Sequence, residues 1–224
     1  MTENSNKNLP VVIGITGASG AIYGVNLIKF FLDTGKRIEL IISDNAIKVF
    51  KLELKLALSA SSPQENKKVL LEYFNINADS KKDLLEIWHQ DNVAACVSSG
   101  SYKTQGMIIA PCSMGTVANI ANGTSNNLIA RAADVILKER RKLILLAREA
   151  PFNTIHLKKM LTLSEVGAII VPASPGFYHH PLTLQDQIDF VIGKTLYVFG
   201  VENELFKRWQ GARSEKFHNQ VTNT

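Results

Sequence analysis

The sequence lacks several features that define whole classes of protein. Only two of its 224 residues are cysteines, Cys96 and Cys112, and neither lies in a CxxC or histidine-rich segment. This excludes a disulfide scaffold, argues against a structural zinc site and favours a reducing compartment. No apolar run approaches the ~20 residues that span a bilayer, and the first ten residues contain no signal-peptide core. We therefore expect a cytoplasmic protein that has no membrane span and no structural zinc site.

An excess of charge of one sign is also largely missing. The 25 Lys and Arg residues and the 20 Asp and Glu residues leave a net charge of +5, and only residues 138–141 form a dense basic cluster. Because no basic stripe with interleaved aromatic residues is present, we predict no nucleic-acid partner. A small ligand that carries phosphate would equally explain cations gathered in one cleft.

What the sequence does contain is a regular alternation of apolar segments. Strands are expected at 11–16, 37–43, 106–111, 142–147 and 167–172, and helices at 19–35, 45–56, 116–121, 127–140, 154–165 and 184–200. The pattern is weak over 60–104, where we expect short elements and loops. Strands that alternate with helices predict a doubly wound α/β domain, Rossmann-like or flavodoxin-like, with a mostly parallel sheet covered on both faces. This single domain is expected over 11–209, between a disordered tail at 1–10 and a polar tail at 210–224.

Small polar residues follow the predicted strands, and the carboxyl ends of parallel strands share one edge of a sheet. The turn TGASG at 16–20 follows the first strand, and Ser43 ends the second. The glycines of this turn would let the backbone approach a ligand, and the helix that follows the turn would offer N–H groups to an anion. The alternative is a tight turn that needs glycine for packing. Since Ser43 rather than an acidic residue ends the second strand, NAD is not favoured.

The segment CSMGT at 112–116 repeats this arrangement after the third predicted strand. Small hydroxyl residues at the start of a helix suit a second ligand contact, but Ser113 or Thr116 would equally serve as ordinary N-caps. We interpret Cys112 as a small buried residue rather than a nucleophile, because no histidine lies near it in the sequence.

Several charged residues lie at positions where a ligand or an ion pair would be expected to compensate the charge. Arg148 and Glu149 directly follow a buried strand, which is costly unless the pair binds a ligand or forms a salt bridge. Arg131 and Lys138 lie seven residues apart on one face of a predicted helix, where they would grip a phosphate or simply face solvent. Tyr178, in a loop rich in proline and glycine, is either a hydrogen-bond donor to a ligand or an aromatic plug.

Six segments in this order resemble the UbiX family of flavin prenyltransferases. They are TGASGAIYG, Ser43 after its strand, PCSMGT, NLIARAADVILKERR, REAPF with IHLKKM, and PASPGFYHHP. The resemblance covers 11–60 and 106–209 and is poor between them. It implies a homododecamer that joins the dimethylallyl group of dimethylallyl phosphate to N5 and C6 of reduced FMN without a metal. The prenylated FMN would serve a UbiD-type decarboxylase, notably in ubiquinone biosynthesis.

The resemblance also implies roles for individual residues. Contacts with FMN are implied for Gly17, Ala18, Ser19, Ser43, Ser113, Met114, Gly115, Thr116 and Arg148. Contacts with the prenyl phosphate are implied for Tyr178 and Lys194, with charge from Arg131, Lys138 and Arg148, and Trp209 matches an aromatic position near the C-terminus. Glu149 and Ser19 match proton-handling positions, and Glu53 matches an acidic position near the site.

Two other functions fit a chain of this kind. An FMN-dependent decarboxylase, of the cysteine or aromatic-acid type, would share the fold and the flavin site. However, the catalytic histidine and the PxMNxxMW-like segment of the cysteine decarboxylases have no clear counterpart in the loop PASPGFYHH. An electron-transfer flavin carrier would not need the cations around a second substrate.

Overall fold

The computed structural model describes residues 9–209, apart from the side chains of residues 78 and 79, so most of the predicted tails lies outside the described residues. Six parallel strands form one sheet in the order β3-β2-β1-β4-β5-β6. They are β1 (Val11–Ile15), β2 (Ile38–Ile42), β3 (Leu85–His89), β4 (Gly106–Cys112), β5 (Lys142–Ala147) and β6 (Ile169–Pro172). The strand order reverses between β1 and β4, which confirms the predicted doubly wound fold and marks the expected ligand crevice.

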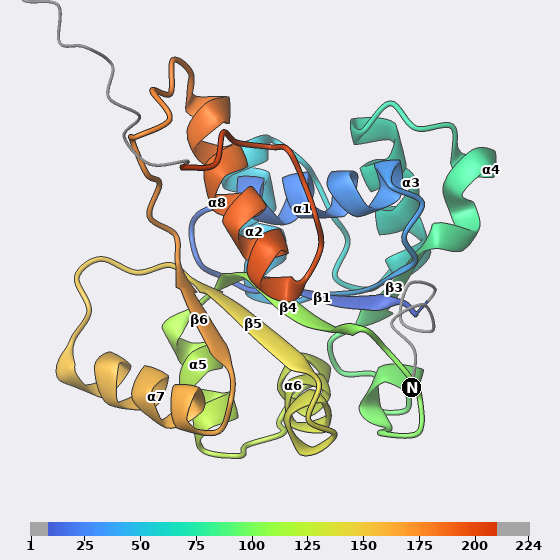
Figure 1. Ribbon diagram of the computed structural model, residues 1–224. Coiled ribbons are helices and arrows are strands. Elements are labelled where there is room, and N and C mark those ends of the chain that lie inside the picture. Colours follow the sequence, from blue (N-terminus) through green and yellow to red (C-terminus); the bar gives the residue numbers. More distant parts are fainter. Residues whose placement is uncertain (1–8, 210–224) are drawn as a thin grey trace, which may run out of the picture.

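Helices cover both faces of this sheet (Figure 1). They are α1 (Ala21–Asp33), α2 (Asp44–Leu54), α3 (Pro63–Tyr73), α4 (Ala78–Lys81), α5 (Met114–Ala121), α6 (Leu128–Lys138), α7 (Thr154–Glu165) and α8 (Leu184–Phe199), with short 3₁₀ turns η2 (Lys82–Leu84) and η3 (Cys96–Ser98). The apolar residues of α1, α2, α3 and α8 pack on one face, and those of α5, α6 and α7 pack on the other. Within residues 9–209, no helix combines the length and apolarity needed to cross a bilayer.

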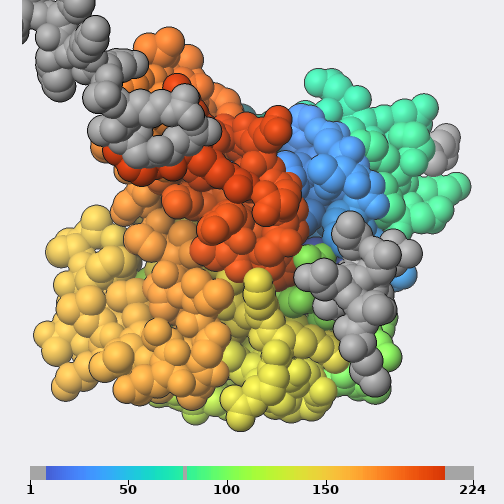
Figure 2. All heavy atoms as spheres, viewed as in Figure 1, coloured from blue at the N-terminus to red at the C-terminus, as the bar shows by residue number. Residues whose placement is uncertain are grey.

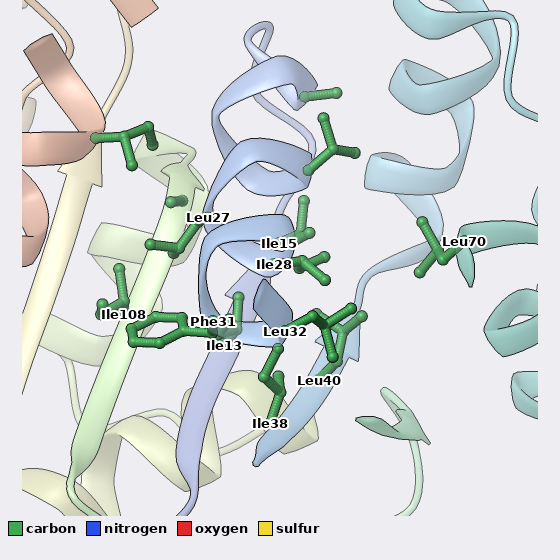
Figure 3. Packing of buried hydrophobic residues seen from close by; sticks show 14 of the residues in the cluster. Ile13, Ile15, Leu27, Ile28, Phe31, Leu32, Ile38, Leu40, Leu70 and Ile108 are labelled. Carbon is green, nitrogen blue, oxygen red and sulfur yellow. The ribbon is translucent and has the colours of Figure 1, made fainter. Parts of the chain in front are cut away.

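The core explains why the central strands are apolar along their whole length. Ile13 and Ile15 of β1 belong to the cluster under α1, whereas Val12 belongs to the cluster on the opposite face. Figure 3 shows Leu27 and Phe31, one helical turn apart on α1, directed at the sheet near Ile13 and Ile108. Burying a side chain of this size contributes about 1.5–3 kcal/mol, so the α1 face is a main source of stability.

The expectation of only short elements and loops over 60–104 is wrong for one element, α3, whereas the five-residue strand β3 fits it. Helix α3 is eleven residues long, but most of its surface is polar, and Leu70 and Leu71 are its only fully buried apolar residues. The sequence nevertheless marks the start of this helix, because serine is a favoured N-cap and proline is favoured at the first helical position. In the structure Pro63 stands at that position, and Ser62 Oγ accepts a hydrogen bond from Glu65 N at 3.3 Å. Strand β3 is an edge strand and only partly buried, so its hydrophobic pattern is short and weak.

After α8 ends, the last described residues, 201–209, fold back along this helix. Asn203 Nδ2 donates to the carbonyl oxygen of Gly193 at 3.0 Å, which fastens the segment 201–209 to the middle of the helix. Figure 2 shows these residues, in red, lying across this face of the molecule between α1, in blue, and the orange residues that precede α8. The C-terminal part of the described chain therefore covers the outer surface of α8.

Candidate flavin site at the carboxyl edge of the sheet

The ends of β1 and β4 are joined by one buried side chain, that of Thr16. Its Oγ1 donates to the carbonyl oxygen of Pro111 at 2.9 Å and accepts from Ser113 N at 2.8 Å. Thr16 is 2% exposed, so both bonds form away from water. The sequence interpretation did not name Thr16 as a functional residue, although its position directly after a buried strand was a usable signal. It fixes two of the predicted ligand loops relative to each other.

Ser43 and Ser113 occupy equivalent places at the carboxyl edge. Each is the N-cap of a helix: Ser43 Oγ accepts from Ala46 N at 3.2 Å, and Ser113 Oγ accepts from Thr116 N at 3.4 Å. The capping alternative raised from the sequence is thus correct for Ser113, and Ser43, for which it was not raised, is a cap as well. A contact of either serine with flavin stays a prediction. The first turn of α5 leaves room for one, because a Cβ added to Gly115 would meet no atom within 4 Å.

The turn TGASG lies directly against α2. A Cβ added to Gly17 would lie 2.4 Å from Asn45 Cβ, so glycine is required there for close packing. At the other end of the turn, the N–H groups of Gly20 and Ala21 both donate to Glu53 Oε2 at 2.9 Å. The expectation that these N–H groups would be open to a phosphate is therefore wrong, because the Glu53 carboxylate already fills the anion position at the start of α1.

Glu53 is held as a carboxylate by this arrangement. Burial by itself would raise its pKa, but hydrogen bonds from Ser19, Gly20 and Ala21 and the charge of Arg148 outweigh burial, so that the pKa lies below its ordinary value. Two predicted functional residues, Ser19 and Glu53, are thus in contact. Their shared position next to the charge of Arg148 places the proton-handling candidates beside the predicted flavin residues.

Arg148 enters the site from the end of β5. Its backbone N–H donates to the carbonyl oxygen of Cys112 at 3.2 Å, and its Nε is buried with no hydrogen-bond partner among the described residues. Its charge also reaches Tyr23, whose pKa is raised by burial and lowered in part by Arg148. Buried guanidinium N–H groups are seldom left unpaired, so this Nε points to a ligand.

Glu149, the next residue, is exposed and does not pair with Arg148. No ion pair joins the two among the described side chains, so the salt-bridge alternative is not found. Glu149 Oε1 accepts only from the backbone N–H of Ala150, at 3.1 Å. Its carboxylate therefore keeps acceptor capacity for a proton. Cys112, by contrast, is fully buried and burial raises the pKa of its thiol, which confirms that it is not a poised nucleophile.

Three residues predicted for the prenyl substrate, Tyr178, Lys194 and Trp209, lie in or beside one group of aromatic rings around α8. The rings of Tyr178, His179, Phe190, Phe206 and Trp209 form what we call the aromatic cluster. Tyr178 lies 5.7 Å from Phe190 and 5.8 Å from Trp209, measured between ring centroids. Lys194 Nζ lies 5.7 Å from the centroid of Phe206, within cation–π range.

Two of the three other predicted cations, Arg131 and Lys138, are not brought to this cluster within one chain. Arg131 binds Asp134 at 2.7 Å and the carbonyl oxygen of Ser98 at 3.1 Å. Lys138 stands at the end of α6 and pairs with Glu139, just before β5 begins, which places it at the amino edge of the sheet. Their role in phosphate binding stays a prediction that needs a neighbouring subunit.

A cavity of about 1100 Å³ lies at this amino edge, lined by residues near the starts of β1, β4 and β5 and the end of α8. It contains none of the predicted site residues. Ligands of doubly wound sheets bind at the carboxyl edge, and the buried unpaired Arg148 Nε lies at that edge. We therefore assign the functional site to the carboxyl edge.

Comparisons with known proteins identify the family of this chain. Residues 1–195 match the model of the Flavoprotein family. The flavin prenyltransferase UbiX of Alkalihalophilus pseudofirmus is 45% identical over 212 residues, which cover 93% of this chain and 99% of that protein. A crystal structure of AnUbiX (PadA1) in complex with FMN and dimethylallyl pyrophosphate has a TM-score of 0.78 and 34% identity, covering 92% of this chain and 100% of that one.

A second solved structure carries a different name. It is a dodecameric FMN-dependent UbiX-like decarboxylase from Escherichia coli O157:H7, with a TM-score of 0.76, 37% identity, and coverage of 91% of this chain and 100% of that one. Fold and site together define an α/β flavoprotein. More narrowly, the chain belongs to the UbiX family of flavin prenyltransferases.

Proposed function

We propose that this protein transfers the dimethylallyl group of dimethylallyl phosphate to reduced FMN and so makes prenylated FMN. The observation that carries the proposal is the group of loops at the β1/β4 crevice, where the buried Nε of Arg148 has no partner among the described residues. Two UbiX proteins that are 44% and 45% identical to it, over 91% and 99% of their own lengths, are named flavin prenyltransferases. We also propose that the domain extends over 11–209, and that it assembles into a dodecamer, as the named Escherichia coli protein does.

The residues at the crevice suit FMN on two counts. Arg148 offers a buried N–H donor, and Gly115 leaves open space at the start of α5. We assign the flavin contacts to the predicted set, Gly17, Ala18, Ser19, Ser43, Ser113, Met114, Gly115, Thr116 and Arg148. Bound there, reduced FMN would supply the nucleophilic ring atoms N5 and C6 that accept the prenyl group.

The charged residues would act on the bond that breaks. When the C–O bond to phosphate breaks, negative charge develops on the leaving group, and a fixed cation stabilises that transition state. We assign this role to Arg148 and Lys194, with Tyr178 donating its hydroxyl, and to Arg131 and Lys138 from neighbouring subunits. The rings of the aromatic cluster would shelter positive charge on the prenyl carbon from water.

Proton transfer falls to the carboxylates. Glu149 Oε would accept the proton lost on ring closure, since that carboxylate is exposed and accepts only the N–H of Ala150. Ser19, bonded to the Glu53 carboxylate, would relay or orient a proton on the opposite side. The product would pass to a UbiD-type decarboxylase, and its use in ubiquinone biosynthesis stays a prediction.

The proposal is tested by the mass of the flavin extracted after anaerobic incubation with reduced FMN and dimethylallyl phosphate. A gain of one five-carbon prenyl unit, seen only with protein, is the expected result. The Escherichia coli relative named as a decarboxylase makes a second activity worth measuring in the same samples. Unchanged FMN together with carbon dioxide released from an aromatic or cysteine-containing acid would replace the transferase with a decarboxylase.

A further inference from the structure

The aromatic cluster contains a histidine, His179, whose two ring nitrogens have no hydrogen-bond partner among the described residues. The ring of His179 lies parallel to that of Phe190, with an interplanar angle of 8° and centroids 5.0 Å apart, and it meets Tyr178 edge-on. Both Nδ1 and Nε2 are buried, and neither is hydrogen-bonded within the described part of the chain. An unpaired buried polar atom costs stability, so a phenylalanine would make the same stack at lower cost.

The turn that carries His179 is also strained. A hydrogen bond of 3.0 Å from His180 N to the carbonyl oxygen of Phe177 closes the turn. His180 has a φ of 55°, in the left-handed region that is unfavourable for a residue with a Cβ. Backbone strain and unpaired buried polar groups both gather at functional sites. Here they occur in adjacent residues, directly after Tyr178.

The support beneath the turn is rigid by comparison. Phe190 is 7% exposed and belongs to the core under α8. The loop backbone rests on it closely, because a Cβ added to Gly176 would lie 2.7 Å from Phe190 Cζ. A rearrangement of the turn would therefore move Tyr178 and His179 together over a fixed platform.

We propose that His179 is a second contact to the phosphate group of the prenyl substrate, beside Tyr178. The turn at 177–180 rearranges when that substrate binds, and an imidazole N–H then donates to a phosphate oxygen. This inference rests on the proposed function. An imidazole supplies such a donor whether neutral or protonated. Asp186, which accepts from Leu182 N and Thr183 N at 2.8 Å, interacts electrostatically with His179.

The test is the variant His179→Phe in the full chain, which keeps the stacked ring and removes the nitrogens. We expect a melting temperature equal to or above that of the wild type and an unchanged Kd for FMN. The KM for dimethylallyl phosphate should rise by about tenfold or more, as expected for loss of a charge-assisted hydrogen bond. The matched control, His180→Asn, removes the neighbouring imidazole and tolerates the left-handed backbone, so its KM should stay near the wild-type value.

Each other outcome overturns the role of His179. An unchanged KM in His179→Phe would show that the nitrogens are not used. An equal rise in His180→Asn, or a loss of FMN binding, would show that the turn has only a general structural role. A less stable or unfolded His179→Phe would contradict the cost assigned to the nitrogens. By contrast, a wild-type protein that forms no prenylated flavin overturns the proposed function itself.

Discussion

The flavin side and the prenyl side of the proposed site are built differently. The flavin residues follow β1, β2, β4 and β5 directly, and short hydrogen bonds such as that from Ser113 N to Thr16 Oγ1, at 2.8 Å, tie their loops together. The prenyl residues stand on α6, on α8 and in the loop after β6. Within one chain, Lys138 lies at the opposite edge of the sheet from the flavin loops.

This difference indicates which contacts position the residues of each half of the site. A residue directly after a parallel strand is placed by the sheet itself, so we expect the proposed flavin contacts of one chain to be positioned without help from another. A residue on a helix is placed by whatever the helix packs against, including other subunits. We therefore expect substitutions on the flavin side to act within a subunit and those on α6 to act between subunits.

Arg148 should show the largest effect, because it belongs to both halves. Replacing Arg148 by methionine keeps the apolar stem and removes the charge that reaches Glu53 and Tyr23. We expect kcat/KM for prenyl transfer to fall by about 100-fold or more, typical for loss of a preorganised charge at a developing anion. Steady-state assays of prenylated flavin measure this. A kcat/KM within threefold of the wild-type value would show that Arg148 does not stabilise the phosphate leaving group.

Two glycines of the flavin half should respond in opposite ways to alanine. In Gly17→Ala the new Cβ collides with Asn45, so the free energy of unfolding should fall by about 1–3 kcal/mol and FMN binding should weaken with it. In Gly115→Ala the methyl group enters open space at the start of α5, so stability should hold or rise while FMN binds more weakly. Thermal melts and flavin titrations of the two variants check both results. Unchanged FMN affinity in Gly115→Ala would place the flavin elsewhere.

Lys138 offers a direct test of whether residues on α6 act between subunits. We expect Lys138→Ala to raise the KM for dimethylallyl phosphate by about tenfold and to leave the Kd for FMN unchanged. Lys138→Ala chains mixed and reassembled with Arg148→Met chains should then regain part of the lost activity, because some interfaces combine an intact lysine with an intact arginine. If the mixture is no more active than the two separate variants, Lys138 does not serve a neighbouring subunit.

The sequence predicted the parts of the molecule that depend on local pattern. Five of the six strands and the loops after them followed from apolar runs bounded by glycine and serine, because central parallel strands are buried on both faces. The missed strand, β3, lies at the edge and is partly exposed, so burial left a weaker pattern in its sequence. Helix α3 was missed because few of its residues are buried.

The site was predictable to the same extent. Ser43, Ser113 and Arg148 were found because they follow strands. The bond from Gly20 N to Glu53 was not predictable, since 33 residues separate the partners and only the path of α2 along the turn brings them together. The resemblance to a family pointed to Glu53 as a residue near the site. It took the fold to show that its carboxylate caps α1.

That cap gives the smallest expected effect, and a dependence on pH. Because the pKa of Glu53 is lowered in the folded protein, its carboxylate contributes stability above the ordinary value of 4.5, and this is lost as the pH falls through the folded pKa. Glu53→Gln should therefore melt below the wild type at pH 7, and the difference should shrink as the pH falls well below 4.5. Melting curves from pH 7 downwards measure it. Two curves that stay parallel over this range would mean that the N–H groups of Gly20 and Ala21 do not depend on the charge of Glu53, and the anion position at the start of α1 would again be open to the flavin phosphate.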